Sequence, residues 1–175
     1  KPTVLIAHDR RFFSEEFART AAIVLAEHGV HPLLSTEAVP TPAVAYEVRR
    51  KKLDGAINFT ASHNPAEYHG LKFSGPDGGP ALPAVTKDIE ARAAKLAARP
   101  QRPGSSFPSA HEKNGFERND FERNDPRPAY LERLDQLVHF DAIRGVSLVF
   151  DALHGCGAGY LDRALAAHRL DARQK

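Results

Sequence analysis

The stretch "TASHNP", Thr60 to Pro65, brings together side chains that could do chemistry. Ser62 offers a hydroxyl that can act as a nucleophile, and His63 offers an imidazole that can exchange a proton. Lys72 follows ten residues after Ser62 and adds an amine. The same residue types are also common in turns, and Asn-Pro often begins one, so a plain loop is the alternative interpretation.

Two familiar kinds of site do not fit this stretch. Consecutive side chains of an extended backbone point in opposite directions, so His63 is badly placed as the base for Ser62 in a serine hydrolase. The G-x-S-x-G elbow of many such hydrolases is also missing. A zinc site built from His8, His63 and His69 would lack any recognised ligand spacing.

The elements around this stretch alternate between strands and helices. Apolar runs predict strands at 3–7, 30–34, 55–61, 71–75 and 146–150. Helical patterns occupy 14–28, 41–52, 83–98, 129–138 and the residues that follow the glycine turn at 154–159. This order predicts an α/β fold: a first domain with a mixed, largely parallel sheet flanked by helices, followed by the start of a second α/β domain.

The predicted first helix has good start and stop signals. Ser14 is the candidate N-cap, two glutamates follow in the first turn, and Gly29 is placed for the C-terminal stop. Five residues at helical spacing predict the buried face: Phe17, Ala21, Val24, Leu25 and His28. The loops at 9–13 and 60–65 both leave predicted strands at the carboxyl end, where ligands of parallel sheets gather.

The chain divides into three parts. Residues 1–98 form the α/β domain that carries Ser62, residues 99–128 are rich in Pro, Gly and Asn and predict a linker, and residues 129–175 predict an incomplete second α/β domain. A tandem "FERND" repeat in the linker is too short to be a structural repeat and is interpreted as a local duplication. Because the chain lacks methionine and its last helical pattern has no cap, we expect a piece of a larger protein.

Composition narrows the class of protein. A formal net charge of +2 gives no reason to expect nucleic acid or a membrane surface as partner. The apolar runs are far shorter than the ~20 residues that span a bilayer. Cys156 is the only cysteine, so an internal disulfide is impossible and a cytoplasmic location is expected.

The longer phrase "GAINFTASHNPAEYHGLKF" closely resembles the phosphoserine loop of the α-D-phosphohexomutases, the phosphoglucomutase/phosphomannomutase family. Four further phrases resemble the same family in the same order: "VLIAHDRRFFSEEFA", "VPTPAVAY", "FSGPDGGPA" and "VFDALHGCGAGYL". The first of these matches the family's G-x-D-x-R-x-x-S turn, with Ala7 in place of the first glycine. The resemblance covers most of the chain outside the linker.

The resemblance implies roles for four residues. It makes Ser62 the phosphorylated nucleophile, Lys72 the general acid/base, His63 the histidine beside the phosphoserine, and Arg11 an arginine that binds phosphate. The implied reaction interconverts hexose 1-phosphate and hexose 6-phosphate through a bisphosphorylated sugar, which makes the enzyme an isomerase. A phosphosugar substrate and a hexose 1,6-bisphosphate activator are implied with it.

Structural roles remain open for the same residues. Arg11 could form a salt bridge with Glu15 on the helix surface, and Lys72 could be a solvated lysine on an edge strand. Asp9 is expected to orient the first loop by hydrogen bonding. Tyr68 and His69 are left without a role.

A different class of protein is the second hypothesis. Gly155, Gly157 and Gly159 stand in a turn between a strand and a helix, as in nucleotide- or dinucleotide-binding modules. Their spacing is G-x-G-x-G, however, and not the G-x-G-x-x-G of the dinucleotide fingerprint. Such a module would also leave "TASHNP" unexplained.

The family resemblance also predicts what these residues lack. Family members have four domains, and they hold Mg²⁺ through the phosphoserine and an aspartate-rich loop of the second domain that has no counterpart here. Only a phosphate on Ser62 would supply metal ligands from this chain. We therefore expect the 175 residues alone to be inactive.

Overall fold

Five strands form the central sheet in this computed structural model, which describes residues 1–99, 121–170 and 172–174. The strands are β1 (Thr3–His8), β2 (His31–Ser35), β3 (Gly55–Phe59), β4 (Leu71–Ser74) and β5 (Arg123–Asn124). Their order is β4-β3-β1-β2-β5, and only the β3–β4 pair is antiparallel. The prediction of a mixed, largely parallel sheet is confirmed.

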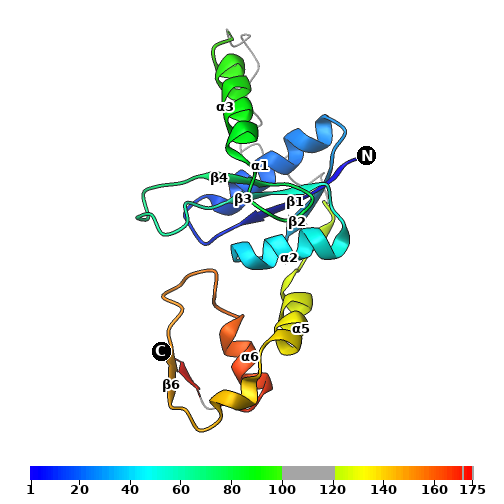
Figure 1. Cartoon of the computed structure of the whole chain (residues 1–175). Coiled ribbons are helices and arrows are strands. Elements are labelled where there is room, and N and C mark those ends of the chain that lie inside the picture. The colour runs from blue at the N-terminus through cyan, green and yellow to red at the C-terminus, as the bar shows by residue number, and fades with distance from the viewer. Residues whose placement is uncertain (100–120, 171, 175) are drawn as a thin grey trace.

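Two helices cover the two faces of this sheet (Figure 1). Helix α1 (Ser14–Glu27) packs its buried alanines against one face, and α2 (Thr41–Lys51) packs against the other. The alternation of β1 explains the two cores, because Leu5 and Ala7 join the α2 side while Ile6 joins the α1 side. The sheet is therefore apolar on both faces, as a largely parallel sheet must be.

The buried face of α1 differs from its prediction. Ser14, Ala18, Ala22 and Ile23 are buried, whereas Phe17, Val24 and His28 are exposed. Only Ala21 and Leu25 of the predicted stripe pack against the core. The observed face is centred on Ala18 and Ala22, one residue further along the chain than the predicted Phe17 and Ala21.

The start of α1 also differs from its prediction. Ser14 is the first helical residue and not the cap, which is Phe13 in a left-handed conformation with φ 61° and no side-chain capping bond. The Ser14 hydroxyl is turned toward the loop after β1. At the other end, Gly29 has φ 79°, so the predicted C-terminal stop is confirmed.

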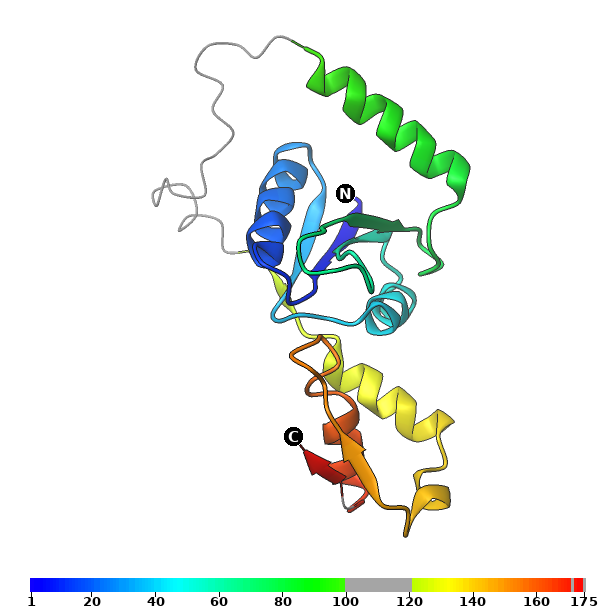
Figure 2. The same ribbon diagram turned by 90° about the vertical axis from the view of Figure 1, so that its left-hand side faces the viewer.

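Helix α3 (Pro83–Ala97) stands apart from the sheet (Figure 2). None of its residues is buried, and it carries the exposed apolar side chains Val85, Ile89 and Leu96. It follows β4 in the chain and does not contribute to the site described below.

A smaller unit follows in the chain. It contains α5 (Arg127–Leu137), a 3-10 turn η1 (Phe140–Ile143), β6 (Leu148–Phe150), α6 (Leu161–Ala167) and β7 (Ala172–Gln174). Strands β6 and β7 are parallel, and a small core of Phe140, Ala164, Leu165 and Leu170 lies beside them.

Part of the predicted linker is built into the first sheet. Residues 100–120, which include the first "FERND" copy, lie outside the described residues. The second copy, 121–125, supplies β5, which pairs with the outer edge of β2 through Leu34–Arg123 and Ser35–Asn124. The second copy of the repeat is therefore part of the sheet.

The smaller unit contacts the first through charged and aromatic side chains. Arg127 is buried, pairs with Glu37 and lies 5.2 Å from the centre of the Tyr160 ring. Tyr160 is itself buried in the α2-side core, next to Tyr130. Within the described residues, no helix combines the length and apolar character needed to cross a bilayer.

Candidate active site

Two loops meet at the carboxyl end of the sheet. Strands β1 and β3 are parallel neighbours, so the loop after His8 and the loop after Phe59 leave the same edge. The N–H of Asp9 donates to the carbonyl of Phe59 over 3.0 Å and ties the two strand ends together. The topology thus places Asp9–Phe13 beside the Ser62 loop.

Ser62 lies at the exposed tip of a tight turn. The N–H of Asn64 donates to the carbonyl of Ala61 over 3.1 Å and closes this turn. Ser62 has φ 58°, a left-handed conformation that costs a non-glycine residue about 1–2 kcal/mol. Its own N–H donates to the Thr60 hydroxyl over 3.1 Å. Strain of this kind is found at functional sites when the surroundings hold it in place.

The Ser62 loop is closed at its base by a backbone hydrogen bond. The N–H of Thr60 donates to the carbonyl of Gly70 over 2.9 Å. A Cβ at Gly70 would lie 2.9 Å from the carbonyl oxygen of Thr60, closer than real side chains come. Glycine is therefore required where the two ends of the loop pass each other.

Arg11 crosses from the first loop and holds the second. Its Nη1 donates to the carbonyls of Pro65 (2.6 Å) and Tyr68 (3.0 Å), and its Nη2 to those of Ser62 (3.2 Å) and Asn64 (2.6 Å). Its Nε donates to Asp9 Oδ2 over 3.2 Å. A guanidinium has five N–H donors, so all of them have protein acceptors here.

This geometry bears on both expectations for Arg11. The alternative of a helix-surface salt bridge is wrong, because Glu15 pairs with Arg19 and Arg11 pairs with Asp9. The family resemblance also implies a phosphate contact for Arg11, yet in this conformation the guanidinium has no donor left for one. Its observed partners are Asp9 and the backbone of the Ser62 loop.

Asp9 orients the first loop, as expected. Its Oδ1 accepts hydrogen bonds from the Arg11 N–H (2.9 Å) and the Ser14 hydroxyl (2.8 Å). Burial alone would raise the pKa of Asp9, but these bonds, the Thr60 hydroxyl and the Arg11 charge together hold its pKa below the ordinary value. The carboxylate is thus ionised and serves as the counter-ion of Arg11.

His69, which sequence analysis leaves without a role, is hydrogen-bonded through both ring nitrogens. Its Nδ1 accepts from the Gly70 N–H over 2.9 Å, and its Nε2 lies 2.9 Å from the Ser14 hydroxyl oxygen. Because Ser14 donates its proton to Asp9, His69 must donate from Nε2, which fixes the neutral tautomer. A serine and a histidine 55 residues apart in sequence give no pattern that would reveal this bond.

His63 and Lys72 are both exposed. Lys72 lies on the edge strand β4, opposite Asn58 of β3, so its side chain is on the α2 side of the sheet. No hydrogen bond or ion pair joins either side chain to another described residue. Their implied roles as histidine partner and acid/base remain predictions.

The possible metal ligands among the described residues are scattered. Within the described ranges, no three His, Cys, Asp or Glu side chains are grouped so that they could hold a metal ion. His8 instead bonds the carbonyl of Asp9 through Nδ1, and His69 is engaged as above. A phosphate on Ser62 would give Mg²⁺ too few of the oxygen ligands that its octahedral coordination requires.

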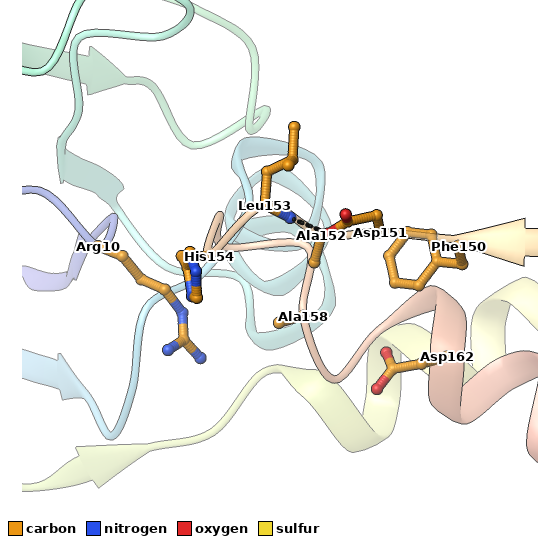
Figure 3. Close-up of a pocket in the computed structure, with 8 residues that line it drawn as sticks. All are labelled: Arg10, Phe150, Asp151, Ala152, Leu153, His154, Ala158 and Asp162. Carbon is orange, nitrogen blue, oxygen red and sulfur yellow. Dashed lines mark hydrogen bonds between the residues drawn. The ribbon is translucent and has the colours of Figure 1, made fainter. Parts of the chain in front are cut away.

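The glycine turn of the smaller unit lines a cavity of about 410 Å³ (Figure 3). Arg10 enters from the first loop, and the remaining lining residues come from 150–162. Three N–H groups of the turn, those of Gly155, Ala158 and Tyr160, are already bonded to nearby backbone carbonyls. Helix α6 has only seven residues, so this turn makes a poor phosphate cradle.

The chain is similar in sequence to known proteins of one family. Residues 1–100 match the family model described as phosphoglucomutase/phosphomannomutase, alpha/beta/alpha domain I. A probable phosphomannomutase of Haemophilus influenzae is 31% identical over 169 residues, which cover 95% of this chain and 33% of that protein. A phosphoglucomutase of Staphylococcus saprophyticus is 36% identical over 87 residues, or 50% of this chain and 16% of that protein.

A solved structure gives the same result. A putative phosphomannomutase from Thermus thermophilus superimposes with a TM-score of 0.79 at 32% identity, covering 98% of this chain and 36% of that chain. These three proteins are therefore much longer than the part that matches. Since the matching family model spans more than half of the sequence, the chain belongs to the phosphoglucomutase/phosphomannomutase family.

Proposed function

We propose that this chain carries the phosphoryl-transferring serine of a phosphohexomutase, an enzyme that interconverts hexose 1-phosphate and hexose 6-phosphate. Ser62 would carry the phosphate. Its Oγ–P bond breaks as a sugar hydroxyl oxygen bonds to phosphorus, giving a hexose bisphosphate. After the sugar reorients, its other phosphate returns to Ser62 and the isomeric monophosphate leaves.

The observation that carries this proposal is the exposure of Ser62 together with its backbone conformation. The residue is exposed on a turn whose left-handed backbone is held by bonds from two sides. Phosphoryl transfer depends mainly on positioning and charge stabilisation, so a rigid, accessible serine suits it. The next N–H along the chain, that of His63, has no acceptor among the described residues and offers a donor for a phosphate.

Lys72 is the proposed acid/base, since an amine within reach of a sugar hydroxyl can exchange a proton with it. His63 is the proposed partner of the phosphoserine. When bound, Mg²⁺ would neutralise phosphate charge, and a phosphate on Ser62 would supply part of its oxygen ligands. The other metal ligands and the sugar-binding loops are proposed to belong to parts of the protein outside the described residues. The relatives' greater length supports that division.

Turnover tests the proposal. The full-length protein should convert glucose, mannose or glucosamine 1-phosphate to the 6-phosphate with Mg²⁺. The Ser62→Ala variant should not catalyse this conversion. These 175 residues alone should show none. No turnover with any of the three sugars would contradict the proposed reaction, and turnover by the 175 residues would contradict the division of the site.

A further inference from the structure

Arg11 and the Ser62 loop share a set of contacts that the chemistry of phosphate binding does not explain. Four backbone carbonyls, from Ser62, Asn64, Pro65 and Tyr68, converge on one guanidinium. The loop residues that supply them lie 51 to 57 positions from Arg11 in sequence. One side chain thus bonds carbonyls along most of the loop.

We propose that Arg11 is a positioning residue: it shapes the Ser62 turn by binding its carbonyls and does not itself bind the transferred phosphate. The inference rests on the proposed function of Ser62. Lysine could not replace it, because a single ammonium has three donors on a flexible stem, whereas the guanidinium presents five donors in a rigid plane.

Asp9 fixes the orientation of the Arg11 side chain. Its carboxylate binds both the Nε and the backbone N–H of Arg11, which fixes the side chain at its root and turns the two terminal nitrogens to the loop. The Arg11 and Asp9 side chains are only 13% and 11% exposed, so water competes weakly at this pair. The ion pair therefore anchors the guanidinium that binds the four carbonyls.

The effect on Ser62 follows from the turn. Ser62 holds an unfavourable left-handed conformation, and its carbonyl is one of the four that Arg11 binds. Without the guanidinium, nothing else among the described residues bonds that carbonyl, so the backbone would relax toward ordinary conformations. The hydroxyl would then occupy its reactive position only part of the time.

Amide hydrogen exchange on the unphosphorylated chain tests the positioning role of Arg11 with no phosphate present. The N–H groups of Asn64 and Tyr68 close turns inside the loop, and that of Thr60 closes its base. In Arg11→Ala and in Arg11→Lys we expect these amides to exchange at least about tenfold faster, because the turns open more often. Arg19→Ala, which removes an exposed arginine paired with Glu15, is the matched control.

The outcomes are distinct. Loop exchange that stays within about twofold of the unchanged chain in both Arg11 variants, with no phosphate present, would overturn the proposal. Full retention of loop protection by Arg11→Lys would also overturn it, since charge alone would then suffice. Arg11→Lys covers the case in which Arg11→Ala fails to fold. Because Ser62 phosphorylation is not part of this readout, failure of the proposed reaction would leave the exchange result standing.

Discussion

Replacing Gly70 with alanine should open the base of the Ser62 loop. The added Cβ would lie 2.9 Å from the carbonyl oxygen of Thr60. That oxygen belongs to the backbone, so it can retreat only if the end of β3 moves. The same movement would stretch the 2.9 Å hydrogen bond from the Thr60 N–H to the Gly70 carbonyl.

The size of the effect follows from these two contacts. Inserting a methyl group into a tight contact costs about 1–3 kcal/mol, and weakening one hydrogen bond costs about 1 kcal/mol. We therefore expect the free energy of unfolding to fall by roughly 2–4 kcal/mol. For a chain of this size that corresponds to a Tm lower by roughly 4–16 °C.

Gly157→Ala is the matched control. A Cβ there would have no heavy atom within 4 Å, and Gly157 is not in the left-handed region. Its unfolding free energy should change by less than about 0.5 kcal/mol. Thermal unfolding followed by circular dichroism, with urea unfolding as a second measure, compares the two variants. Equal Tm values would refute the tight contact at Gly70.

Three further predictions concern single side chains. Lys72→Ala in the full-length protein should lower kcat by roughly 10²–10⁴ and change KM much less, as for a lost general acid/base. An unchanged kcat would show that Lys72 is not the acid/base. The folded-state pKa of Asp9 lies below its ordinary value of 3.8, so its ionised form stabilises the fold above about pH 4, and this contribution disappears as the pH falls through the lowered pKa. Asp9→Asn should therefore flatten the acid dependence of the unfolding free energy, and an unaltered slope would contradict this. Arg127→Ala should lower the unfolding free energy by about 1–3 kcal/mol, because Arg127 is buried against Tyr160 and pairs with Glu37; urea unfolding with no loss would show that this contact does not stabilise the fold.

Sequence patterns predict the elements that set the fold. Short apolar runs locate β1, β2 and β3, and their parallel order places the two loops at one edge. The face of α1 is harder to predict, because large apolar residues such as Phe17 suggest burial while the sheet accepts small ones such as Ala18. Strand β5 has two residues in a Pro- and Asn-rich stretch, and only its distant partner β2 makes it a strand.

The candidate site, too, is only partly predictable from the sequence. The family resemblance of the phrase around "TASHNP" singles out Ser62, whereas the residue types alone also fit a plain loop. The partners of Arg11 are mostly backbone carbonyls, which every residue has, so no pattern could predict that its guanidinium binds the loop. The bonds of His69 to Ser14 and Gly70 depend in the same way on the folded loop.

Phosphorylation of Ser62 tests the central claim most directly. The full-length protein is incubated with a hexose 1,6-bisphosphate, its intact mass is measured, and the modified peptide is mapped. The Ser62→Ala variant is the control. The proposed function predicts the added mass of one phosphate, located on Ser62 and missing from the control. Phosphate on another residue, or no added phosphate, would contradict it.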